Sequence, residues 1–177
     1  GMPAGGKNRD GIAYARFPEW YFCPKCRRFQ PLSKWIAEFD KKAKEQEKTN
    51  NRNMSRRLYC PKDRVELVVA RIVTVCERGH INDFPWVKWT HAKSFGSPKP
   101  VCANPQLTFT TSPVASEGLE GLSLKCTTCN ASATLKDAFN DGLFGLLDEK
   151  TENKYDFTCE GRHPWKNQTD ACPCYPK

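Results

Sequence analysis

The sequence lacks long apolar runs, and it has few hydrophobic residues of any kind. Only 38% of its 177 residues are hydrophobic, and no stretch approaches the length of a membrane-spanning helix. The first residues, GMPAGGKNRDG, are polar and contain no apolar segment of the kind that directs secretion. These absences lead us to expect a cytoplasmic protein with no membrane partner.

The pattern also lacks a large hydrophobic core, because 13 prolines and 11 glycines interrupt it. Chains with a thin core need cross-links, and the ten cysteines can supply them as disulfides or as metal ligands. Two Cys-x-x-Cys pairs, Cys23–Cys26 and Cys126–Cys129, have the spacing that places two thiolates on one turn around a tetrahedral ion. With no secretory segment in view, the sequence favours zinc over disulfides.

The expected fold class is α+β: a small zinc-stapled domain of short antiparallel strands, with zinc-ribbon-like knuckles and two or so helices. Residues 60–76 are rich in β-branched side chains and predict one strand, while LTFTTSPV and LSLKC predict two more. Helices are predicted in PLSKWIAEFDKK and over residues 134–147, the latter closed by Gly142 or Gly145.

The spacing of the cysteines predicts a first zinc site at Cys23, Cys26 and Cys60. Asp63 stands where a second knuckle would carry its partner cysteine. It either completes the site as a carboxylate ligand or is a bystander, with another group or water in the fourth place.

A second predicted site contains Cys126 and Cys129. Its distal pair comes from three candidates, Cys159, Cys172 and Cys174, of which we expect Cys159 and Cys172 to bind.

The stretch CERGHINDFPW (76–86) leaves several alternatives open. Cys76 and His80 could join His91 and Cys102 in a third tetrahedron, or Cys76 is a buried thiol and His80 a hydrogen-bonded turn residue. The aromatic residues that follow favour a structural corner in which Asp83 caps the turn that starts at Phe84. An exposed Trp86 or Trp89 would instead stack on an unpaired base.

Basic residues outnumber acidic ones by 28 to 20, which permits contact with nucleic acid. Many lie in segment 40–57, which is either a solvated helix end and loop or a basic arm that orders on a phosphate backbone. We expect residues 1–12 to be a disordered tag or tail, and residues 13–177 to form one composite domain into which 40–57 is inserted. The candidate phosphate contacts are Arg27, Arg28, Lys41, Lys42, Arg52, Arg56 and Arg57.

The runs ARFPEWYFCPKC, VTVCERGHINDFPWVKWTH and CEGRHPW resemble the DrmB family, zinc-binding accessory proteins of the DISARM anti-phage system. These proteins carry a domain of unknown function shared with some helicases. The resemblance runs from about Phe17 to Cys174, and GHINDFPWVKW with CEGRHPW is its specific part. Family chains are longer, so a fragment or shortened relative is expected.

The resemblance implies zinc, a superfamily-2 helicase as partner, and DNA as the shared target. The sequence departs from the family pattern at Asp63, where the second cysteine of a Cys-x-x-Cys knuckle is expected. The residues that carry the implied zinc sites are Cys23, Cys26, Cys60, Cys126, Cys129 and Cys159.

Three functions are therefore compatible with the sequence. The first, which we favour, is a non-catalytic zinc module that supports a helicase and contacts DNA in anti-phage defence. The second is a metal-dependent nuclease of the HNH type, because Asn82 and His91 lie nine residues apart, although His80 stands too close to Asn82 for that motif. The third is a purely structural domain that binds only protein.

Overall fold

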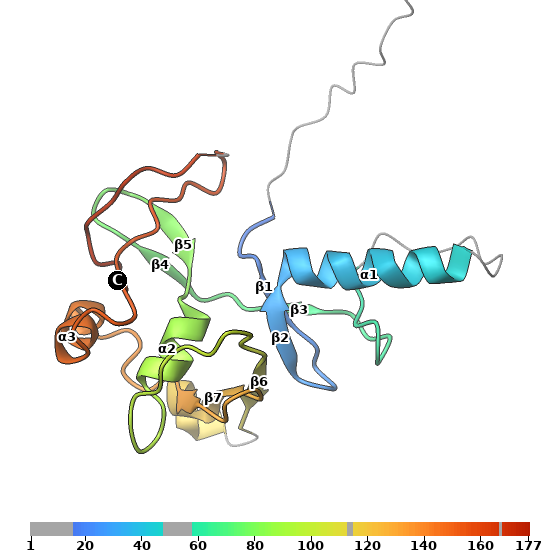
Figure 1. Cartoon of the computed structure of the whole chain (residues 1–177), viewed down its shortest axis with the longest axis horizontal. Coiled ribbons are helices and arrows are strands. Elements are labelled where there is room, and N and C mark those ends of the chain that lie inside the picture. Colours follow the sequence, from blue (N-terminus) through green and yellow to red (C-terminus); the bar gives the residue numbers. More distant parts are fainter. Residues whose placement is uncertain (1–15, 48–57, 113–114, 167) are drawn as a thin grey trace, which may run out of the picture.

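The structure is a computed structural model that describes residues 16–47, 58–112, 115–166 and 168–177. Two antiparallel sheets and three α-helices make up this part of the chain (Figure 1), which confirms the expected α+β class of short antiparallel strands. The elements are β1 (Trp20–Phe22), β2 (Arg28–Pro31), α1 (Leu32–Glu47), β3 (Val68–Val69), β4 (Val73–Val75), β5 (Ile81–Asp83), α2 (Trp86–Ala92), β6 (Leu107–Thr111), the 3-10 segment η1 (Ala115–Gly121), β7 (Leu122–Cys126), β8 (Ser132–Thr134) and α3 (Leu143–Lys150).

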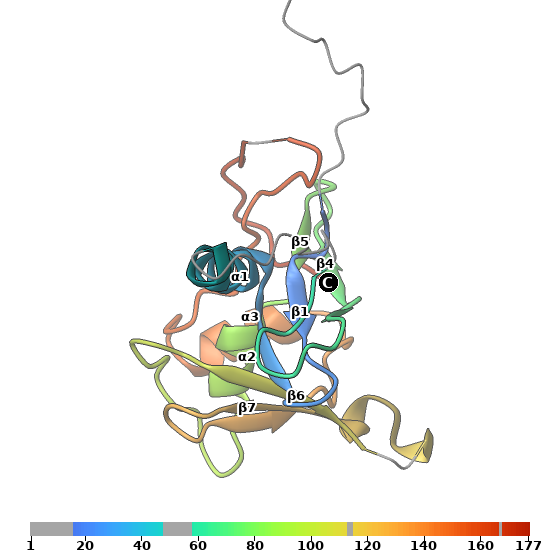
Figure 2. The same ribbon diagram turned by 90° about the vertical axis from the view of Figure 1, so that its right-hand side faces the viewer.

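The larger sheet has six strands in the order β3-β1-β2-β6-β7-β8, and every pairing is antiparallel. The predicted strands in LTFTTSPV and LSLKC are its hairpin β6–β7, in which Phe109 lies opposite Leu124. Figure 2, which looks nearly along α1, shows this hairpin below β1. The smaller sheet is the hairpin β4–β5, in which Thr74 lies opposite Asn82.

The single strand expected over residues 60–76 is wrong. The chain forms β3 and β4 there, and the break at Ala70–Ile72 moves it from the larger sheet to the smaller one. Ala70 is 5% exposed, and its N–H donates to Trp20 O, so the break is buried against β1. The run of β-branched residues cannot show such a change of sheet, because these residues favour a strand in either sheet.

Two hydrophobic clusters lie on either side of the larger sheet's first strands. The main cluster packs α2, β6, β7 and α3 together, with Trp86 and Trp89 at its centre. The smaller cluster holds Trp35 of α1 against Cys23 and Cys60, and the Trp35 indole N–H donates to the carbonyl of Tyr21 at 3.0 Å. The α1 helix is thereby tied to the first cysteines.

The last predicted helix starts later than the sequence suggests. Gly142 precedes α3 with a φ of 73° instead of closing it, so the turns before it are not part of the helix. Asp148 of α3 is 1% exposed and accepts a hydrogen bond from the backbone N–H of Phe157 at 2.6 Å, which fixes the start of the C-terminal segment. Among the described residues, no helix is long and apolar enough to cross a membrane.

Candidate metal centres

Three tight turns of the same geometry carry half of the cysteines. In each, the first residue is a cysteine whose C=O accepts from the N–H four residues later, and whose own N–H donates to the C=O five residues later. The fifth residue has a positive φ, which is 66° at Arg27, 56° at Arg64 and 60° at Asn130. We call these turns knuckle 1 (23–27), knuckle 2 (60–64) and knuckle 3 (126–130).

Knuckles 1 and 2 face each other and form site 1, which consists of Cys23, Cys26, Cys60 and Asp63. The ligand atoms of these residues all lie within 4.8 Å of one another. The Sγ atoms of Cys26 and Cys60 are 3.8 Å apart, and Asp63 Oδ2 is 3.3 Å from Cys23 Sγ and 3.5 Å from Cys60 Sγ. Zinc bonds of about 2.0–2.3 Å give tetrahedral edges of about 3.3–3.8 Å, so these spacings fit an ion at the centre.

Knuckle 3 joins β7 to β8 and forms site 2 with His91 and Cys102. The helix α2 contacts β7 and β8 and is buried around most of its surface. His91, in the last turn of α2, therefore packs against knuckle 3. His91 Nε2 lies 3.3 Å from Cys129 Sγ, and Cys102 Sγ lies 3.6 Å from Cys126 Sγ. These are again edges of a tetrahedron that would suit zinc.

Site 3 lies at the tip of the β4–β5 hairpin and consists of Cys76, His80, Cys159 and Cys172. The hairpin turn returns sharply because Gly79 has a φ of 79°, which a residue with a side chain rarely adopts. Cys76 Sγ is therefore only 3.3 Å from His80 Nδ1, and 3.9 Å from Cys172 Sγ. The C-terminal segment supplies the other two ligands.

Both histidines are oriented as metal ligands usually are, with the second ring nitrogen bonded to an acceptor. His91 Nδ1 lies 2.7 Å from the carbonyl of Val87, which leaves Nε2 facing the sulfurs of site 2. His80 Nε2 lies 3.5 Å from Asp170, which leaves Nδ1 facing the sulfurs of site 3. With these outer contacts, the residues present at both sites have the geometry that metal ligation needs.

His163 and Asp170 gather beside His80 as a further group of potential ligands. Asp170 Oδ2 is hydrogen-bonded to His163 Nε2 at 3.2 Å and lies 3.5 Å from His80 Nε2. Since the other nitrogen of His80 already faces site 3, Asp170 acts as the carboxylate that orients this histidine.

Backbone N–H groups of the knuckles favour thiolates. Burial raises the pKa of the Cys126 thiol, but hydrogen bonds from the turn, first that of Cys129, outweigh it and lower the pKa to about 6. Burial, followed by the nearby thiol of Cys126, raises the pKa of Cys102 to about 11. A dication at the centre would supply the positive charge that so many closely spaced sulfurs need to ionise together.

The ligand groups predicted for the second and third sites are wrong. Cys126 and Cys129 do not meet Cys159 and Cys172, because knuckle 3 lies under α2 while the C-terminal segment pairs with the β4–β5 hairpin. Nor do Cys76 and His80 meet His91 and Cys102. Cys76 and His80 flank the turn between β4 and β5, whereas His91 lies in the last turn of α2 and Cys102 in the loop between α2 and β6. The structure instead distributes these eight residues between site 2 and site 3.

Backbone pairing brings the candidate ligands of site 3 together. The spacing of the cysteines in the sequence does not reveal this pairing. The last residues add a strand-like segment beside β4, with mutual backbone hydrogen bonds between Val75 and Lys177 at 2.8 and 3.0 Å. The N–H of Cys159 also donates to the carbonyl of Cys174, so the chain doubles back on itself there. Cys174 is left outside the tetrahedron, with its Sγ 3.4 Å from Glu77 Oε1.

Trp86 and Trp89 are not exposed, so neither ring is available to stack on an unpaired base. They are 1% and 0% exposed, because α2 packs between β7, β8 and the aromatic rings of the main cluster. The structural corner is thus the correct alternative, but Asp83 does not cap it. Asp83 Oδ1 accepts from the backbone N–H of Glu19 at 2.9 Å, and α2 begins without a side-chain cap.

The candidate phosphate contacts are scattered over different environments. Arg28 is bound to Glu38 at 3.1 Å and lies over the Trp35 ring at 4.7 Å, so its charge is already paired. Lys41 is exposed on α1, and Lys42 donates to the carbonyl of Pro61 in knuckle 2 at 2.6 Å. Arg27 donates to Thr111 Oγ1 at 3.1 Å. The remaining candidates, Arg52, Arg56 and Arg57, lie outside the described residues.

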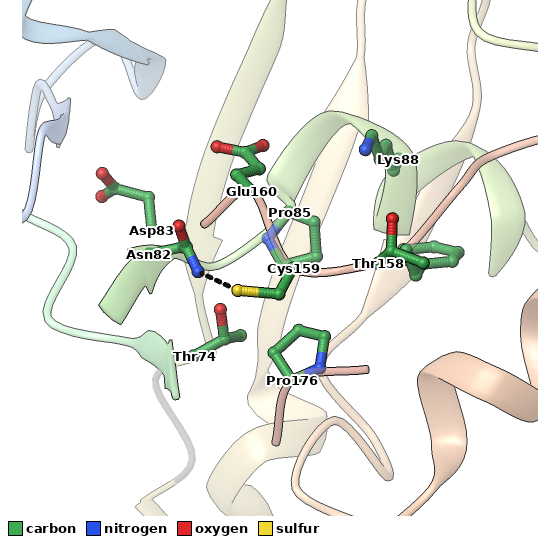
Figure 3. A pocket seen from close by; sticks show the side chains of 10 residues that line it. Thr74, Asn82, Asp83, Pro85, Lys88, Thr158, Cys159, Glu160 and Pro176 are labelled. Carbon is green, nitrogen blue, oxygen red and sulfur yellow. Dashed lines mark hydrogen bonds between the residues drawn. The ribbon is translucent and has the colours of Figure 1, made fainter. Parts of the chain in front are cut away.

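The pocket beside site 3 is too small for a substrate. It measures about 10 Å³, and Figure 3 shows Asn82 pointing across it to Cys159, whose sulfur accepts from the amide at 3.2 Å. A larger cleft of about 290 Å³ lies nearby, but Arg162 is paired there with Glu19 and, at 3.7 Å, with Asp83. None of the residues of sites 1, 2 and 3 lines that cleft.

The comparisons with known proteins agree with the resemblance expected from the sequence. The chain is 30% identical to the DISARM protein DrmB of Bacillus paralicheniformis over 114 residues, which confirms that it is similar to DrmB. The matched part is 64% of this chain and 17% of that protein, so the chain spans only a small part of this relative. A family model described as a domain of unknown function (DUF8724) matches residues 2–177. The chain belongs to the DUF8724 family.

Proposed function

We propose that this protein is a non-catalytic, zinc-stapled accessory module that supports a helicase partner and contacts DNA in anti-phage defence. The three four-ligand sites carry the proposal, because each brings together potential ligands from separate segments of the chain. Site 3, for example, ties the hairpin β4–β5 to the last residues of the chain. Zinc suits donor sets of three thiols with a histidine or a carboxylate, at tetrahedral spacing.

The similarity to the DISARM protein DrmB supports a role in defence, and the family resemblance supports a helicase as the partner. Contact with DNA is supported by charge, since the chain carries a formal net charge of +8. Exposed basic side chains on α1 and on the knuckles would provide contacts with the phosphate backbone.

The residues that suggested a nuclease are otherwise engaged. His91 is fully buried in site 2, and His80 is 4% exposed in site 3. Asn82 is 3% exposed and donates to Cys159. A general base and a metal-binding asparagine would have to reach a phosphodiester, and these three side chains face sulfur ligands instead.

A mobility-shift assay with zinc-loaded protein tests the DNA part of the proposal. We expect a shift on single-stranded and overhang DNA at 50 mM salt, and a loss of affinity of tenfold or more, as an order of magnitude, at 200 mM salt. Absence of any shift at 50 mM salt would contradict DNA contact and favour the domain that binds only protein.

The helicase part needs a separate test. The protein is mixed with a superfamily-2 helicase from a DISARM system, and we expect the two to elute together from a size-exclusion column after nuclease treatment. An unrelated superfamily-2 helicase is the control. Separate elution of the protein and the DISARM helicase would contradict this part of the proposal.

A further inference from the structure

Knuckles 1 and 2 share a sequence feature that knuckle 3 lacks. They read Cys-Pro-Lys-Cys-Arg and Cys-Pro-Lys-Asp-Arg, whereas knuckle 3 reads Cys-Thr-Thr-Cys-Asn. Since all three turns have the same backbone hydrogen bonds, the turn itself does not require the basic residues. Knuckle 3 thus serves as an internal reference for what this turn needs.

The arginines occupy a backbone conformation that disfavours them. Arg27 and Arg64 have positive φ values of 66° and 56°, a region in which asparagine is enriched and longer side chains are uncommon. Knuckle 3 has Asn130 at the equivalent position, with a φ of 60°. Strained residues of this kind are concentrated at functional sites, so two arginines in the same strained position point to a use for their charge.

The two knuckles that carry these basic residues meet at a single site. The ligand atoms of site 1 come from both knuckles and lie within 4.8 Å of one another, so the two tips are neighbours. Lys25, Lys62 and Arg64 are exposed, and Arg27 is half-buried. Lys42 of α1 donates a hydrogen bond to the carbonyl of Pro61 in knuckle 2, which places this basic part of α1 on the same face.

We propose that knuckles 1 and 2 form a clamp for the phosphodiester backbone of DNA, with Lys25, Arg27, Lys62 and Arg64 as its contacts. The clamp rests on the DNA contact in the proposed function and gives that contact a location. Lysine and arginine bind phosphate oxygens without reading base sequence, so the clamp would hold DNA of any sequence. The four cations outnumber the net double negative charge of a zinc ion with three thiolates and one carboxylate.

The test replaces the basic residues of knuckles 1 and 2 with the residues that knuckle 3 has at the same positions. The variant Lys25→Thr, Arg27→Asn, Lys62→Thr, Arg64→Asn keeps every site 1 ligand and places asparagine where the backbone favours it. We expect its zinc content to match the parent and its melting temperature to be equal or higher. Affinity for DNA should fall about tenfold or more, and the slope of log affinity against log salt should decrease by about one for each phosphate that the variant no longer binds.

A matched control removes the same charge elsewhere. Lys125, Lys136, Lys150 and Lys154 are exposed residues outside knuckles 1 and 2, and changing all four to threonine should alter affinity much less than the knuckle variant. A milder variant, Lys25→Gln with Lys62→Gln, keeps both arginines and serves if the larger variant loses zinc. Its affinity should fall by an intermediate amount.

The outcomes separate the clamp from the proposed function. If the parent shifts DNA and the knuckle variants bind as the parent does, or no more weakly than the control, the clamp is wrong while DNA contact stands. If the parent itself shows no shift at low salt, the DNA contact and the clamp are both overturned.

Discussion

Asp63 distinguishes site 1 from the other two sites, which have histidine as the fourth ligand. The hydrogen bond with the Cys26 thiol is the main cause that lowers the pKa of Asp63, so the carboxylate is held ionised. We expect Asp63→Ala to weaken zinc binding at site 1 by about tenfold or more, since even outer-shell changes cost that much. Asp63→Cys should retain zinc at least as tightly as the parent.

Competition with a zinc chelator measures this difference. Glu66→Ala is the control, because Glu66 is exposed close to knuckle 2 and belongs to none of the three sites. Equal zinc retention by Asp63→Ala and the parent would show that Asp63 is a bystander, the alternative that the sequence left open.

The tryptophans offer a second residue-scale prediction. Trp86 is 1% exposed and contacts Phe29 and Phe84, with ring centroids 5.0 and 4.8 Å apart. We expect Trp86→Ala to lower the free energy of unfolding by about 3–5 kcal/mol. Trp165 is 64% exposed, so Trp165→Ala should cost less than about 0.5 kcal/mol. Urea unfolding of both variants tests this, and similar midpoints for the two would contradict the buried corner.

Among the elements, we expect the C-terminal segment (residues 157–177) to depend on site 3. Few hydrogen bonds hold it beyond those with β4 and β5, so its two cysteine ligands should carry much of its attachment. We expect Cys159→Ser to release the zinc of site 3 and to expose residues after Cys159 to limited proteolysis. Cys174→Ser should change neither, because Cys174 lies outside the tetrahedron. Loss of zinc in Cys174→Ser but not in Cys172→Ser would reverse the assignment of these two neighbours.

Local sequence patterns predicted the secondary-structure elements better than they predicted which residues share a metal site. The β-branched runs indicated β6 and β7, and the Cys-x-x-Cys spacing indicated knuckles 1 and 3, since both depend on neighbouring residues. The grouping of ligands depends on tertiary packing: His91 meets knuckle 3 only because α2 lies on β7 and β8. Site 1 was predictable because two similar knuckles, each beginning Cys-Pro-Lys, mark its halves. Sites 2 and 3 combine residues of a helix or a hairpin with residues of distant loops. The spacing of these residues in the sequence does not show which of them meet.

Across the whole molecule, we propose that three metal ions hold the fold together. Together the three sites take ligands from knuckles 1 to 3, α2, the β4–β5 turn and the C-terminal segment, so each removes freedom from a different part of the chain. A structural zinc site contributes about 10 kcal/mol or more to folding, which is comparable with the total stability of a small domain.

Native mass spectrometry of the purified protein tests this claim most directly. We predict three zinc ions per chain, and two in each of Cys23→Ser, Cys102→Ser and Cys172→Ser, which remove a ligand from one site apiece. A parent protein with two zinc ions or fewer, or variants that retain all three, would show that three ions do not hold the fold together.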